Sequence, residues 1–175
     1  MIKSQKRRGI LDEILNTIKD PYVYKTIDYV KKDEAYVKAF LHGPLIKKVK
    51  QLYMTHTMVR EETVAEHALS SVVWEGDKKT TVHNMTLFGV MHRPDMEVNF
   101  NDMNIALEFK KGDSGQSVRD IIGQSIVYSK AYDFVISLLI DTSPRKNIVN
   151  SINGIHEQTI IKSLWDMHNI VLDFV

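Results

Sequence analysis

Two carboxyl groups and one amine in the middle of the sequence have the types and the spacing of groups that act together in chemistry. Asp95 stands at the start of one strand-like segment, and Glu108 and Lys110 stand two residues apart in the next. Carboxylates bind divalent cations, and a bound cation lowers the pKa of its water. A nearby amine can orient that water or neutralise a developing oxyanion. These residues could therefore support metal-dependent hydrolysis of a phosphate ester.

The alternation of apolar and polar residues predicts that these three side chains share one face of a sheet. Residues 96–100 and 105–110 both alternate, and successive side chains of a strand point to opposite faces. The apolar face would hold Met96, Val98, Phe100, Ile105, Leu107 and Phe109. Asp95 would lie on the opposite face with Glu108 and Lys110, and we expect the two segments to form an antiparallel hairpin.

Such a face needs a cation. Two carboxylates about 4 Å apart repel by roughly 4 kcal/mol at an effective dielectric constant of about 20. One lysine offsets only part of this repulsion, whereas a divalent ion with oxygen ligands resolves it. Mg²⁺ or Mn²⁺ is therefore the expected cofactor, because Mg²⁺ suits a site of few carboxylates, waters and a substrate phosphate.

The rest of the chain predicts an α/β fold with a mixed sheet flanked by helices. We expect a helical N-terminal extension over residues 1–58 and the α/β core over residues 59–175. The predicted helices are 10–18, 33–41, 45–54, 60–74, one from the loop at 112–116 to about 131, and a region from 144 interrupted near 154. The predicted strands are 80–90, 96–100, 105–110, 134–140 and 170–175. Gly43-Pro44 is expected to separate two of the helices.

The string Arg93-Pro94-Asp95, twelve intervening residues and Glu108-Phe109-Lys110 resemble the motif of the PD-(D/E)xK nuclease superfamily. This superfamily includes restriction enzymes, Holliday-junction resolvases and RecB-like exonucleases. Its αβββαβ core order is similar to the order predicted for residues 60–140. The resemblance implies a restriction-endonuclease-like fold, a metal held by Asp95, Glu108 and the carbonyl of Phe109, and Lys110 as a catalytic amine.

The resemblance also implies two helical site residues. Members of the superfamily often carry an acid on the first core helix, which would also bind the metal, and Glu66 matches it, with Glu62 as the alternative one turn earlier. Many members carry a glutamine on the helix after the second motif, and Gln124 looks like that residue. Residues 1–58 resemble no part of the superfamily, so the substrate stays open: DNA or RNA, branched, single-stranded or double-stranded, cut internally or from an end.

The charge distribution favours a nucleic-acid partner, with DNA ahead of RNA. Residues 1–60 hold 13 Lys+Arg against 6 Asp+Glu, and the remainder holds 10 against 16. A basic first part could contact phosphates while the acidic remainder holds a metal. Solvated lysine-rich helix faces are the alternative explanation. A homodimer is expected if the substrate is a branched junction, because resolvases act as dimers.

The composition excludes several other classes of protein. With no cysteine, the chain has no disulfide, no zinc-cysteine site and no thiol catalysis. The longest apolar run, 134–140, is far shorter than the roughly 20 residues of a membrane span. Acids at positions 12 and 13 interrupt the stretch that would follow a signal peptide's basic start. We expect no membrane partner and a cytoplasmic location, and a compact chain of this kind would suit a virus or mobile element.

Other interpretations of the same residues stay open. Glu108 and Lys110 could be an exposed pair on a solvated sheet face, and Gln124 and Glu66 could be surface residues. Glu97 shares the face of Asp95 and is either an outer acid of the site or exposed to solvent. The whole chain could be a catalytically inactive nucleic-acid-binding or structural protein with the nuclease fold, or a helical module that binds other proteins.

Overall fold

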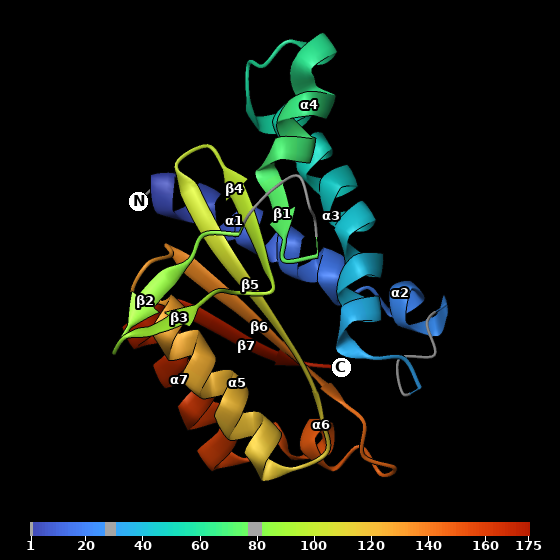
Figure 1. Ribbon diagram of the computed structural model, residues 1–175, viewed down its shortest axis with the longest axis vertical. Coiled ribbons are helices and arrows are strands. Elements are labelled where there is room, and N and C mark those ends of the chain that lie inside the picture. The colour runs from blue at the N-terminus through green and yellow to red at the C-terminus, as the bar shows by residue number, and fades with distance from the viewer. Residues whose placement is uncertain (1, 27–30, 77–81) are drawn as a thin grey trace. The chain divides into compact units, whose positions relative to one another are not determined.

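The structure is a computed structural model that describes residues 2–26, 31–76 and 82–175 (Figure 1). Its α/β fold contains a mixed five-stranded sheet flanked by helices, in the strand order β1-β4-β5-β6-β7. The five strands are β1 (Val72–Trp74), β4 (Met96–Phe100), β5 (Met103–Gly112), β6 (Phe134–Asp141) and β7 (Ile170–Phe174). A separate two-stranded sheet consists of β2 (Met85–Leu87) and β3 (Val90–His92).

The chain divides into two compact units. Unit 1 comprises Met1–Thr81 and Val98–Met103, and unit 2 comprises Val82–Glu97 and Asn104–Val175. Among the described residues, no helix is long and apolar enough to cross a membrane. The division expected at residue 58 stays a prediction.

Four helices make up most of unit 1. They are α1 (Ile2–Ile18), α2 (Pro21–Thr26), α3 (Glu34–His56) and α4 (Glu61–Ser71). Helix α1 begins eight residues earlier than the alternation predicted, and α2 was not predicted. The side chain of Asp33 caps α3 by accepting a hydrogen bond from the backbone N–H of Tyr36 at 2.8 Å.

The predicted break at Gly43-Pro44 is wrong, because α3 runs through it without interruption. A proline inside a helix costs about 3 kcal/mol or more, since it removes one hydrogen bond and crowds the preceding turn. Helix α3 offsets this cost with a continuous buried stripe formed by Val37, Leu41, Leu45, Val49 and Leu52. Burying each such side chain contributes about 1.5–3 kcal/mol. The summed burial therefore outweighs the local defect.

The first strand of the sheet also differs from the prediction. The helix expected over residues 60–74 ends at Ser71, and Val72–Trp74 form β1 instead, since β-branched and aromatic residues favour a strand. The strand expected over 80–90 falls partly outside the described residues. Its described part is a hairpin outside the five-stranded sheet, which turns at Phe88 and Gly89.

Unit 2 is built on β5, β6 and β7, and its parallel pairs are β5 with β6 and β6 with β7. One face of these strands is covered by α5 (Gly115–Tyr128) and α7 (Ile155–His168), which lie side by side (Figure 1). A short helix, α6 (Asn147–Ser151), precedes α7. The core on this face includes Ala106, Ile121, Tyr128, Val135, Leu139, Leu164, Ile170 and Leu172. The predicted strands β6 and β7 and the predicted helix α5 are confirmed.

The predicted hairpin of β4 and β5 is confirmed as well. The two strands are neighbours in the sheet, and the turn of Asn101 and Asp102 joins them. A connection this short joins only antiparallel strands. Asn101 has φ 53°, a left-handed conformation that asparagine tolerates better than most residues.

Candidate functional site

Glu108 and Lys110 lie on the face of β5 that α5 covers. In the parallel ladder Glu108 is paired with Ser137, and side chains of paired residues point to the same face. The hydroxyl oxygen of Ser137 lies 2.5 Å from the hydroxyl oxygen of Ser125 on α5. Glu108 is 4% exposed, and Lys110, two residues further along the same face, is half-buried. The two are therefore not an exposed pair on a solvated face.

Asp95 is held directly beside this pair. Its Oδ2 accepts a hydrogen bond of 2.8 Å from the backbone N–H of Phe109, the residue between Glu108 and Lys110. Asp95 is 9% exposed. A carboxylate has two oxygens with about four acceptor positions, so it can bind several partners at once, a cation among them. Asp95 thus lies against the segment of β5 that carries Glu108 and Lys110, within unit 2.

Helix α5 is hydrogen-bonded to the segment just before Asp95. The hydroxyl of Tyr128, at the end of α5, donates a 2.7 Å hydrogen bond to the carbonyl of Arg93, two residues before Asp95. Gln124 lies four residues before Tyr128 and therefore on the same side of the helix. Its Oε1 is buried and has no hydrogen-bond partner among the described residues. Gln124 thus brings a buried acceptor to the side of α5 that faces the site.

The helix acid of the prediction lies in the other unit. Glu66 and Glu62 are both on α4 in unit 1, and both are exposed. The assignment of Glu66 to the metal site stays a prediction.

Sequence reasoning gave Glu97 too small a role. Glu97 is 5% exposed, and its Oε1 accepts hydrogen bonds from the backbone N–H of His83 at 2.5 Å and from the hydroxyl of Tyr132. Burial and the hydrogen bond to Glu97 raise the pKa of Tyr132 well above its ordinary value, so the phenol stays protonated and donates. No local pattern in the sequence signals this role, because the two donors come from positions 83 and 132 of the chain.

The donor set suits a hard divalent cation. Asp95, Glu108 and the carbonyl of Phe109 offer oxygen ligands only, which Mg²⁺ and Mn²⁺ prefer. In the described part of the chain, no group of three or more histidine, aspartate or glutamate side chains could hold a metal ion. A cation here would therefore rest on two carboxylates and a backbone carbonyl, with waters or substrate completing its shell.

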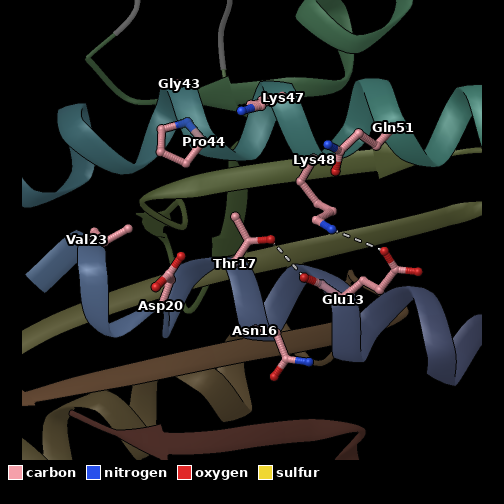
Figure 2. Close-up of a pocket in the computed structure, with 10 residues that line it drawn as sticks. All are labelled: Glu13, Asn16, Thr17, Asp20, Val23, Gly43, Pro44, Lys47, Lys48 and Gln51. Carbon is pink, nitrogen blue, oxygen red and sulfur yellow. Dashed lines mark hydrogen bonds and ion pairs between the residues drawn. The ribbon is translucent and has the colours of Figure 1, made fainter.

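Another concavity lies in unit 1 between α1, α2 and α3, with a volume of about 670 Å³. Figure 2 shows its lining, in which the amine of Lys48 meets the carboxylate of Glu13 at 3.3 Å. Thr17 donates a hydrogen bond to the carbonyl of the same Glu13 at 2.9 Å (Figure 2). The lining thus contains both acidic and basic side chains, and one pair of them is joined by an ion pair.

Comparisons with known proteins do not assign the chain to a family. No protein-family model, no curated protein and no solved structure matches it. The nuclease interpretation therefore depends on the residues and on the geometry described above.

Proposed function

We propose that the chain is a metal-dependent nuclease of the PD-(D/E)xK type that hydrolyses phosphodiester bonds of nucleic acid, DNA ahead of RNA. The hydrogen bond from the Phe109 backbone to Asp95 is the observation that carries this proposal. It joins the carboxylate of one motif to the backbone of the other, fourteen residues further along the chain. This contact holds the acid of the first motif against the strand that carries Glu108 and Lys110, as the proposed site requires.

Each side chain of the site has a distinct part in the proposed reaction. Asp95, Glu108 and the Phe109 carbonyl would hold Mg²⁺ or Mn²⁺, which when bound supplies an acidified water and charge stabilisation at the phosphate. Lys110 would orient the attacking water and neutralise the negative charge that develops on the phosphate oxygens. Gln124 would accept a hydrogen bond from that water or hold the substrate strand with its amide.

Cleavage of a labelled panel tests this proposal directly. The panel contains single-stranded, duplex and branched DNA and single-stranded RNA, each incubated with Mg²⁺, Mn²⁺ or EDTA. Wild type is expected to cut at least one substrate with either metal and none in EDTA. Lys110→Ala should lower the rate by about 100-fold or more, because one group that stabilises developing charge is typically worth that much. The folded state of each variant is checked by circular dichroism.

Lys162→Ala is the matched control. Lys162 lies in the same unit on α7, its side chain is 74% exposed, and it pairs with Asp166 one helical turn later. Its loss should leave cleavage unchanged. If wild type and Lys110→Ala are equally inert on every substrate, the chain is an inactive binding or structural protein instead.

A further inference from the structure

The β2–β3 hairpin presents apolar side chains to solvent immediately before the site. Phe88 at its tip is 95% exposed, and Val90 and Met91 on β3 are 57% and 65% exposed. The hairpin lies outside the five-stranded sheet (Figure 1). Isolated two-stranded hairpins are marginal in water, so this one depends on how its ends are held.

Both ends of the hairpin are anchored to the site's own framework. Before β2, the backbone N–H of His83 donates to buried Glu97. After β3, the carbonyl of Arg93 accepts a hydrogen bond from Tyr128 of α5. The exposed tip is thus carried on a fixed base that belongs to the same unit as Asp95.

The tip conformation makes Phe88 an unexpected residue. Phe88 has φ 51° and Gly89 has φ 75°, as a two-residue hairpin turn with positive φ at both central positions requires. Asparagine, aspartate or glycine ordinarily occupies the first of these positions, and a bulky side chain there is strained. Neither burial nor turn geometry explains a phenylalanine here. Strain of this kind concentrates at functional sites.

The charge of the hairpin favours a polyanion as its partner. Residues 82–94 contain no aspartate or glutamate, although the chain has 22 of them, and they include His83, His92 and Arg93. Asp95 lies seven positions after Phe88, and a chain of that length spans at most about 25 Å. A stacked strand advances about 3.4 Å per nucleotide, so the tip can reach a base within about seven nucleotides of a phosphate at the site.

We propose that Phe88 stacks on an unpaired base of the substrate, so that the site acts on single-stranded nucleic acid or on unpaired segments beside a branch. This inference rests on the proposed nuclease function and names its substrate class. The aromatic ring supplies a stacking surface that accepts any base. Stacking one base on an aromatic side chain changes affinity roughly five- to 150-fold.

Binding measured without cleavage tests the inference. In a Lys110→Ala background, a single-stranded oligonucleotide with a central 2-aminopurine is titrated, following its anisotropy and fluorescence, and a blunt duplex of the same length is compared. Phe88→Asn, which suits the turn, should weaken single-strand binding roughly five- to 150-fold and abolish the fluorescence quenching. Phe88→Trp should restore both. Ile155→Ala, which truncates another exposed apolar side chain, should change neither.

Four results would overturn the inference. In the first, Phe88→Asn binds the single strand as tightly as its parent does. In the second, Phe88→Asn loses affinity for the duplex by the same factor as for the single strand, which indicates groove binding. Sedimentation could also show that the parent is a dimer that Phe88→Asn dissociates, which makes the tip a contact between copies. If Lys110-containing Phe88→Asn cleaves single strand and duplex in the wild-type ratio, the inference fails while the nuclease function stands. If wild type cuts nothing, only the nuclease function fails, because the binding measurement still reports on Phe88.

Discussion

Glu97 joins three segments of unit 2 at the scale of a single residue. It lies on β4, and it accepts hydrogen bonds from Tyr132 after α5 and from the backbone N–H of His83 before the hairpin. A buried carboxylate is costly unless it is hydrogen-bonded. Two donors meet this requirement, so Glu97 holds the base of the hairpin and the end of α5 two residues from Asp95.

Tyr132→Phe should therefore lower the free energy of unfolding by about 1–3 kcal/mol, because it takes one donor from a buried carboxylate. The pKa of Tyr132 is raised in the folded state, so this contribution is complete below the unfolded pKa of about 10 and is lost only as pH rises further. Urea unfolding at pH 7 measures the effect. Tyr22→Phe, at a 75% exposed position, is the control and should stay within about 0.5 kcal/mol of wild type. An equally small change in Tyr132→Phe would show that Glu97 does not need this donor.

At the scale of an element, Asp141 organises the connection from β6 to α6. Its Oδ1 accepts from the backbone N–H of Ser143, and its Oδ2 accepts from the N–H groups of Ile148 and Val149. Burial by itself would raise the pKa of Asp141. The hydrogen bonds from Ser143, Val149 and Ile148 outweigh that effect and hold the pKa below its ordinary value.

Because this pKa is lowered on folding, the stability that Asp141 contributes is present above the unfolded carboxyl pKa of about 3.9 and is lost as pH falls through the folded value. Asp141→Asn should cost about 2–4 kcal/mol at pH 7, since its amide turns a donor toward backbone donors. It should also flatten the acid limb of a plot of stability against pH. Asp113→Asn, at an exposed position, is the control and should change neither the stability at pH 7 nor its decrease in acid. If the stability of Asp141→Asn fell in acid as steeply as that of wild type, Asp141 would not be the source of this pH dependence.

Two glycines of unit 2 should respond in opposite ways to the same substitution. Gly123 lies inside α5, and an added Cβ would meet no described atom within 4 Å. Gly123→Ala should raise the free energy of unfolding by about 0.5–1 kcal/mol, the difference in helix propensity. At Gly112, at the end of β5, an added Cβ would collide with the side chain of Ser117, so Gly112→Ala should lower it by about 1–3 kcal/mol. Thermal melts of both variants measure the contrast, and equal signs would contradict it.

The sequence predicts an element correctly where its local pattern agrees with its burial in the fold. It does not predict features that depend on contacts between residues distant in the chain. Alternation predicted the β4–β5 hairpin and the shared face of Glu108 and Lys110, and an apolar run interrupted only by Ser137 predicted β6. The continuity of α3 through Pro44 could not be read locally, because it depends on the buried stripe along the whole helix. The role of Glu97 as a buried acceptor could not be predicted either, since its donors come from positions 83 and 132 in the chain.

At the scale of the whole molecule, a net charge of +1 conceals two opposite parts. Residues 1–60 are basic and the remainder is acidic, so under the proposed function the first part would attract a polyanion and the second would hold a cation. The hydrogen bond between Asp95 and Phe109 lies in the acidic part. The proposed nuclease function thus agrees with the charge of the chain as well as with the geometry of its site.

A crystal structure of the wild type soaked with Mn²⁺, measured at the manganese absorption edge, tests the central claim most directly. The proposal predicts an anomalous peak ligated by the carboxylates of Asp95 and Glu108 and by the carbonyl of Phe109, at about 2.0–2.3 Å from each oxygen. The same peak should be absent from Asp95→Asn crystals. Saturating Mn²⁺ that leaves this position without a peak, or that binds only elsewhere, would contradict the assignment of a metal-dependent nuclease.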